Sequence, residues 1–157
     1  MNKQKPHLQL SVFDRLHSEE DPGFIGNAGD DMDIVRNAVL RDVENLLNTR
    51  RRIIRPAESC KHLKASIYTY GVEDFATKNP RNPQVRHSIK TTIRETLSRF
   101  EPRLRNVAVA FNPREGKDQG LCFSVQATLH ADPVSEPICF DTWFSASRGE
   151  YKIENVK

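Results

Sequence analysis

The residues from Phe100 to Leu104 mark the point at which the hydrophobic period of the chain changes. Upstream of them apolar residues recur every three or four positions, as on one face of a helix. Downstream they alternate every second position, as along a strand. Pro102 cannot continue a helix, because its ring clashes with the preceding turn and its nitrogen has no hydrogen to donate. The stretch therefore predicts a corner at which a helix ends and a strand begins.

Glu101 and Arg103 stand on either side of this proline and carry opposite charges. A carboxylate and a guanidinium at such a corner can form a charge-assisted, bidentate contact that fixes the direction in which the chain leaves. The partner of each group is either internal or on another protein. A role in stability and a role in docking are thus both open for this pair.

A first helix is expected over residues 31–49, where Asp30 and Asp31 can cap its start and complement the positive end of its dipole. Its apolar residues fall at helical spacing, at Val35, Val39, Val43 and Leu46. An arginine run follows the helix at residues 50–52, where cations interact favourably with the negative end of the dipole.

A second helix is expected from Asn82, as its N-cap, and Pro83, at its first position, to about Phe100. Beside its apolar stripe runs a row of cations, which we interpret as a solvated face: Arg86, Lys90 and Arg94. Between the two helices, residues 66–72 fit either a short strand or an irregular buried segment.

Downstream of Pro102 the alternation predicts strands near residues 107–111, 121–129, 138–144 and 151–153. Turn residues separate them, at 112–116, 132–133 and 147–149. One face of each strand is expected to be buried, with Cys122 on the other face. We therefore expect an α+β fold in which N-terminal helices pack on a C-terminal antiparallel β-meander of three to four strands. Residues 31–157 form a single domain in this interpretation, and residues 1–30 a loosely ordered segment.

The formal net charge of +3 conceals an acidic stretch over residues 1–33 and a basic stretch over residues 34–64. This asymmetry indicates either separate faces for separate partners or one docking contact within the chain. Its strongest feature is the run of Arg50, Arg51 and Arg52. No aromatic residue for base stacking lies between residues 47 and 66, which argues against a nucleic-acid module. Pairing with carboxylates of another protein is the better interpretation.

Enzymatic motifs are sparse. The histidines and cysteines show no zinc or disulfide spacing, and the run Cys60-Lys61-His62 is too short a pattern to define a metal site. Glu101 paired with Asp74 or Asp141 could hydrolyse a glycan, although the corner already gives Glu101 a structural explanation. We therefore expect no enzyme, cofactor or metal.

The chain also lacks an apolar run of the roughly 18–20 residues that span a bilayer, and it lacks a signal-peptide core. Together with its few, unpaired cysteines, this predicts a reduced, cytoplasmic protein.

Four stretches, in this order, resemble the TssE family, a baseplate subunit of the bacterial type VI secretion system related to a wedge subunit of contractile-phage baseplates. The matching residues are 11–16 (SVFDRL), 39–51 (VLRDVENLLNTRR), 70–75 (YGVEDF) and 100–104 (FEPRL).

The resemblance implies a non-enzymatic structural subunit that joins the baseplate wedge with TssF, TssG and TssK. Members of the family also help to anchor and nucleate the contractile TssB/TssC sheath around the Hcp tube. The Glu-Pro-Arg motif of the family falls on Glu101, Pro102 and Arg103.

We therefore expect this corner and the arginines at 50–52 to contact partner proteins. A meander leaves at least one sheet edge available for strand addition, and the final hairpin, residues 138–155, together with this corner is expected to form a surface that faces the sheath or the wedge. The baseplate as a whole docks at the membrane, but this chain is expected neither to insert into it nor to bind nucleic acid. A lysozyme-like glycan hydrolase is the alternative.

Overall fold

The computed structural model describes residues 28–54, 56–57, 59–75, 78–79, 82–111, 121–132, 134–145, 148–154 and 156. Within these residues two α-helices, α2 (Ala28–Asn48) and α3 (Pro83–Phe100), precede the strands, and two 3-10 helices, η1 (Leu63–Ala65) and η2 (Ile67–Thr69), lie between them. The four strands are β1 (Leu104–Phe111), β2 (Leu121–Ala131), β3 (Val134–Ser145) and β4 (Glu150–Glu154). The α+β fold predicted from the sequence is confirmed. Of the expected N-terminal segment, residues 1–27 lie outside the described residues.

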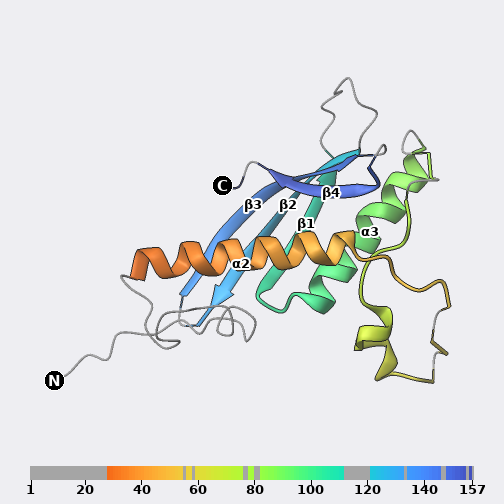
Figure 1. Ribbon diagram of the computed structural model, residues 1–157, viewed down its shortest axis with the longest axis horizontal. Helices are drawn as coiled ribbons and strands as arrows, with labels where there is room; N and C mark the ends of the chain where they lie inside the picture. The colour runs from red at the N-terminus through yellow and green to blue at the C-terminus, as the bar shows by residue number, and fades with distance from the viewer. Residues whose placement is uncertain are drawn as a thin grey trace.

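The strands form an antiparallel meander in the order β1-β2-β3-β4. Figure 1 shows α2 running across the sheet and α3 lying beside β1. The apolar stripes of both helices and one face of the sheet share a single core, whose fully buried members include Val39, Val43, Ile93, Leu97, Phe123, Val125, Leu129 and Phe140. Burial of each such large side chain contributes about 1.5–3 kcal/mol, which makes this layer the main source of stability.

The second helix begins as its sequence predicts. Pro83 is its first residue, and the side chain of Asn82 accepts a hydrogen bond from the backbone N–H of Gln84 at 2.9 Å. The first helix begins earlier than predicted, at Ala28 rather than residue 31. Asp30 and Asp31 therefore lie within its first turn. Acids are favourable there as well as before a helix, so the pattern could not distinguish the two positions.

The segment at residues 66–72 is neither a strand nor a wholly buried stretch. Its first half turns as η2, in which Ile67 is 90% exposed and Thr69 is buried. Only Val72 pairs like a strand residue, in an isolated parallel bridge with Arg50.

A β-bulge interrupts β1, where strict alternation was expected through Val107. Asn106 and Val107 together stand opposite the single residue Ala127 of β2, so the buried face passes from Leu104 to Val109. Asn106 has a φ of +55°, in the left-handed region that asparagine tolerates better than most residues. Alternation could not reveal this bulge, because an inserted residue leaves the pattern intact on both sides.

Cys122 is buried, although it lies on the sheet face opposite Phe123. Its neighbour across the β2–β3 ladder is Trp143, a side chain large enough to cover a thiol. The expectation that this face would be solvated at residue 122 was wrong. Of the expected turns, residues 112–116 and Ser147 lie outside the described residues, whereas Gly149 closes the β3–β4 hairpin with a φ of +67°.

The hydroxyl of Thr142 is buried in the core and finds no hydrogen-bond partner among the described residues. We predict that Thr142→Val raises the free energy of unfolding by about 1 kcal/mol, because the substitution keeps the shape and removes an unsatisfied polar group. Chemical denaturation measures the change. Thr69→Val is the matched control, since the Thr69 hydroxyl donates to the Lys64 carbonyl at 2.9 Å, and it should lower stability by about 1 kcal/mol. Equal effects of the two substitutions would contradict this assignment.

Candidate functional site

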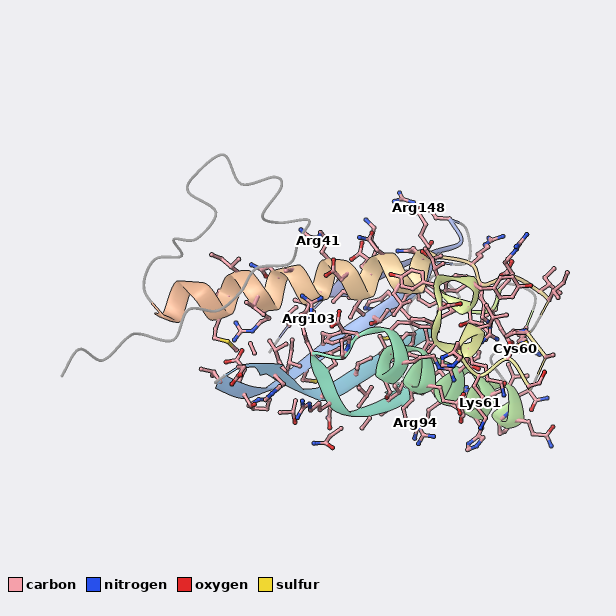
Figure 2. The ribbon with its side chains drawn as sticks, turned by 90° about the horizontal axis from the view of Figure 1, so that it is seen from below. Arg41, Cys60, Lys61, Arg94, Arg103 and Arg148 are labelled. Carbon is pink, nitrogen blue, oxygen red and sulfur yellow. The ribbon has the colours of Figure 1, made fainter. Side chains whose placement is uncertain are left out.

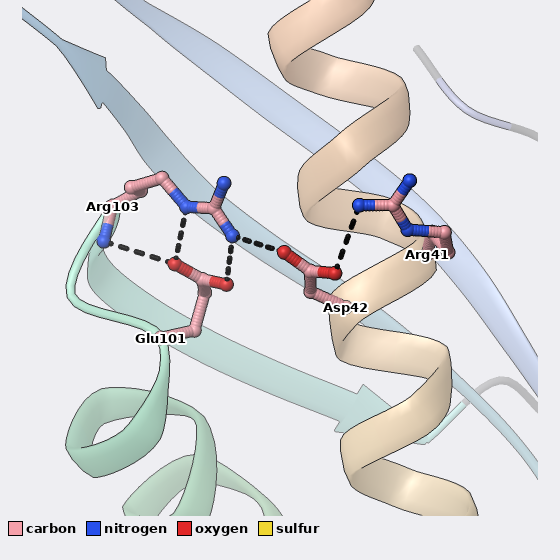
Figure 3. Close-up of polar contacts among 4 residues, drawn as sticks. All are labelled: Arg41, Asp42, Glu101 and Arg103. Atoms are coloured by element: carbon pink, nitrogen blue, oxygen red, sulfur yellow. Dashed lines mark hydrogen bonds and ion pairs between the residues drawn. The ribbon is translucent and has the colours of Figure 1, made fainter. Parts of the chain in front are cut away.

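The corner at residues 101–103 is held by a network of charged contacts, which we call the brace: Glu101, Arg103 and Asp42 (Figure 3). Arg103 binds Glu101 in a bidentate manner, with Nε 2.7 Å from Oε1 and Nη2 2.7 Å from Oε2. The same Nη2 donates to Oδ2 of Asp42 on α2, also at 2.7 Å. Glu101 is only 3% exposed, and its Oε1 also accepts the backbone N–H of Arg103 at 3.2 Å.

The backbone of the corner is fixed as well. Glu101 ends α3 by donating its N–H to the Leu97 carbonyl at 2.9 Å, and its own carbonyl accepts the N–H of Leu104 at 3.0 Å. The carbonyl of Arg103 then accepts the N–H of His130 at 2.8 Å, which starts the β1–β2 ladder. The brace thus joins the end of α3, the start of β1 and the C-terminal half of α2.

Electrostatics in the brace favour its charged form. The hydrogen bond to Glu101 raises the pKa of Arg103 above its ordinary value, and the bond to Asp42 adds to this, whereas burial alone would lower it. Tyr70 lies beside the brace with its ring edge-on to Phe100, at 5.3 Å between centroids. Burial and the neighbouring carboxylates of Asp42 and Glu101 raise the pKa of Tyr70, so its phenol stays neutral.

A second network joins the end of α2 to residues 71–73. Arg51 donates its N–H to the Val72 carbonyl at 2.8 Å, and its Nη2 binds Oε1 of Glu73 at 2.5 Å. Gly71 makes this approach possible. It has a φ of +98°, and a Cβ at this position would lie 2.2 Å from the carbonyl oxygen of Thr49. Any other residue would push the two segments apart.

The arginines predicted to contact partners therefore differ in their surroundings. The side chain of Arg51 is 19% exposed and occupied by Glu73, while that of Arg50 is 67% exposed and pairs with Asp74 at 3.2 Å. Arg52 is exposed and lies over the ring of Tyr68, 5.5 Å from its centroid. Of the three, Arg50 and Arg52 face outward, whereas Arg51 ties the backbone together.

The β3–β4 turn lies against this outward surface. A Cβ added at Gly149 would lie 3.5 Å from Nη2 of Arg50, and the neighbouring Arg148 is exposed on the turn (Figure 2). Arg148 lies more than ninety residues from Arg50 in the sequence, so the distribution of charge along the chain does not indicate that the two are neighbours. At the corner itself, Pro102 is exposed, whereas Glu101 is buried.

The outer edge of β4 is covered by α2. The side-chain amide of Asn48 donates to the Tyr151 carbonyl at 2.9 Å and accepts the Tyr151 N–H at 2.7 Å, as a neighbouring strand would. Glu44 accepts the N–H of Ile153 at 3.3 Å. The outward backbone groups of Tyr151 and Ile153 are therefore already bonded by α2, so strand addition at β4 would have to displace it. The remaining edge of the sheet is β1.

Two residues of these networks were missed in the sequence, Asp42 as the partner of Arg103 and Asn48 as the cap of β4. The sequence did contain a signal for Asp42. An acid next to the buried stripe at Val39 and Val43 lies at the border of the core, where a charged side chain needs a partner. Nothing local marks Asn48, because its partner is 103 positions away.

The carboxylates considered for glycan hydrolysis, Glu101 with Asp74 or Asp141, do not form a catalytic pair in the structure. Both oxygens of Glu101 are bound by Arg103, and Asp74 pairs with Arg50. Asp141 alternates with the buried Phe140 and therefore faces away from the core. Within the described residues no set of three or more His, Cys, Asp or Glu side chains is placed to hold a metal ion. Neither α2 nor α3 has the length and hydropathy to cross a bilayer.

Fold and contacts together define a small α+β protein whose distinctive charged residues hold its own corners in place, as is typical of a structural component. A family model described as baseplate wedge protein gp25 matches residues 34–134, which include the brace and the contacts of Arg51. The match spans more than half of the chain, and the chain belongs to this family, as does TssE. Membership gives it a structural role in the baseplate of a contractile injection system. No curated protein matches the chain.

We predict that Arg103→Ala lowers the free energy of unfolding by about 3 kcal/mol, because it leaves the carboxylate of Glu101 buried without its partner. Denaturation by urea measures the loss. The double variant Glu101→Ala with Arg103→Ala should lose less than the sum of the two single variants, since it removes both charges.

Arg41→Ala is the control for this experiment. Arg41 also contacts Asp42, at 3.3 Å, but its side chain is 42% exposed, so its removal should change stability by less than about 0.5 kcal/mol. Similar losses for Arg41→Ala and Arg103→Ala would show that the brace adds no particular stability.

Proposed function

We propose that this protein is the TssE-type subunit of a type VI secretion system baseplate, located on the cytoplasmic side of a membrane-docked assembly. It joins the wedge with TssF, TssG and TssK and anchors or nucleates the TssB/TssC sheath, and it acts as a scaffold rather than as an enzyme. The observation that carries this proposal is the family match at residues 34–134, within which three of the four TssE-like stretches are in direct contact with one another.

These contacts support a scaffold role for the Glu-Pro-Arg motif. Residues 39–51 supply Asp42 to the brace and Arg51 to the second network, and residues 70–75 and 100–104 supply their partners. In this proposal Glu101 and Arg103 set the shape of the corner, and the exposed Pro102 between them presents it to a partner.

For wedge binding, the cations that point outward are the better candidates. Arg50 and Arg52 are exposed, and an arginine at an interface pairs well with carboxylates of a partner. Arg51 contributes indirectly, by fixing the segment that carries the other two.

We expect the double variant Arg50→Glu with Arg52→Glu to bind purified wedge proteins TssF, TssG and TssK at least tenfold more weakly, because like charges then face each other. Its circular dichroism spectrum should be unchanged. Lys90→Glu with Arg94→Glu reverses two exposed cations of α3 and is the matched control, expected within twofold of the native affinity. The proposal fails if the native chain does not bind the wedge proteins, and the role of Arg50 and Arg52 fails if both variants bind equally well.

For the sheath, β1 is the edge that supports strand addition. We find no side chain in the described part of the chain that caps the backbone of Leu104–Phe111 in the way Asn48 caps β4. An edge strand recruits a further strand through backbone hydrogen bonds, so a TssB or TssC segment can extend the sheet at β1.

Hydrogen exchange tests which edge the sheath uses. On assembly with TssB and TssC, the amides of β1 should exchange at least tenfold more slowly, while those of Tyr151 and Ile153 change little because α2 already holds them. Asn48→Ala serves as a control that frees the β4 edge, and it should speed exchange at Tyr151 without altering the gain at β1. Protection that appears on β4 instead would contradict this assignment.

A further inference from the structure

A pocket of about 450 Å³ opens between the connection that follows α2 and one side of α3. We call it the α3 pocket. Its lining includes Arg52, Ile54, Lys64, Tyr68, Thr92 and Arg99. The volume lies within the range of about 300–1,000 Å³ that is usual for binding sites on proteins.

Exposed apolar side chains gather around this pocket. Ile54 lines it and is 74% exposed, while Ile53 is 98% and Ile67 90% exposed, and each is next in sequence to a lining residue. Leu63, next to Lys64, is 42% exposed. Four of the seven large apolar side chains found exposed in the described residues thus belong to one short segment. A group of this kind marks an interaction surface more often than scattered single residues do.

The turn at residues 63–69, which carries Leu63 and Ile67, is held by hydrogen bonds. The Thr69 hydroxyl donates to the Lys64 carbonyl at 2.9 Å, and Nη1 of Arg99 on α3 donates to the same carbonyl at 3.1 Å. The Ser66 hydroxyl donates to the Leu63 carbonyl at 2.9 Å. Leu63 and Ile67 are therefore displayed on an ordered turn that is fixed to α3.

Positive side chains outnumber acidic ones in the lining of the pocket. Arg52, Lys64 and Arg99 line it, and Glu95 is the acid that opposes them. A second lining acid, Glu73, is bound by Arg51 and by Lys78 at 3.1 Å, which neutralises it.

We propose that the α3 pocket binds an amphipathic segment of a baseplate partner protein, with apolar side chains entering beside Ile54 and Ile67 and with Asp or Glu side chains meeting Arg52 and Lys64. A concave pocket with cations at fixed positions fits individual side chains of a protein better than the flat surface of a membrane. This proposal rests on the wedge role proposed above and names the chemistry of one of its contacts.

The test uses the full chain assembled with purified TssF, TssG and TssK. A photo-reactive phenylalanine analogue at position 54 or 67 should cross-link to a wedge-protein peptide that carries both apolar and acidic residues, whereas one at position 90 should not. The variant Ile54→Ser, Lys64→Glu, Ile67→Ser should bind the wedge proteins at least tenfold more weakly. Lys90→Glu with Arg94→Glu should stay within twofold, because Arg94 extends from α3 away from α2 (Figure 2).

Three results would overturn the proposal while leaving the wedge role intact. The first is unchanged wedge binding by the triple variant. The second is cross-linking from positions 54 and 67 only to residues 1–27 of this chain or to a second copy of it. The third is pocket-dependent binding to vesicles of anionic phospholipid instead of to the wedge proteins. The substituted side chains are exposed, and an unchanged unfolding midpoint verifies that the variant folds. Failure of the native chain to bind the wedge proteins would refute the proposed function and this inference together.

Discussion

The contact of Arg103 with two carboxylates is the interaction on which the arrangement of the helices and the sheet depends. Glu101 would be costly to bury alone, because removing a carboxylate from water without a partner carries a penalty of several kcal/mol. The planar guanidinium offsets this by occupying both oxygens of Glu101 and still reaching Asp42 on α2. A lysine has a single donating nitrogen and could not match this geometry. One side chain therefore fixes where α3 stops, where β1 starts and how α2 lies against both.

The stretches that resemble TssE are, in the structure, largely one another's partners. Asp42 and Arg51 come from one stretch, Glu73 from the next and Arg103 from the last, and each pairs across stretches. This favours a division of labour in which the motif residues fix the shape of the protein, while their exposed neighbours meet other proteins. Docking and stability, which the sequence left as alternatives for Glu101 and Arg103, need not exclude each other, because the brace places Pro102 at the surface.

The features that could be predicted are those determined by residues close together in the sequence. The start of α3 follows from Asn82 and Pro83, and the meander follows from alternation, since both depend on neighbouring residues. The features that were missed depend on approach between distant segments. The need for glycine at position 71 comes from the carbonyl of Thr49, and the burial of Cys122 comes with a tryptophan on the next strand. The bulge at Asn106 could not be predicted for a different reason. One inserted residue leaves a plausible strand pattern on either side of it.

The two edges of the sheet differ in whether their outward backbone groups are already bonded, and this difference bears on where a strand of the proposed sheath can add. A sheet with two open edges pairs indiscriminately, so natural proteins cover, charge or bend their edges. Here α2 covers β4 through Asn48, whose side-chain amide reproduces the donor and acceptor of a strand. The other edge, β1, carries the bulge at Asn106, which twists a strand and breaks the regular ladder that a random partner would need. A partner strand must then match that local shape to add to β1. Strand addition restricted to one edge and one register would give the proposed sheath assembly a single starting direction.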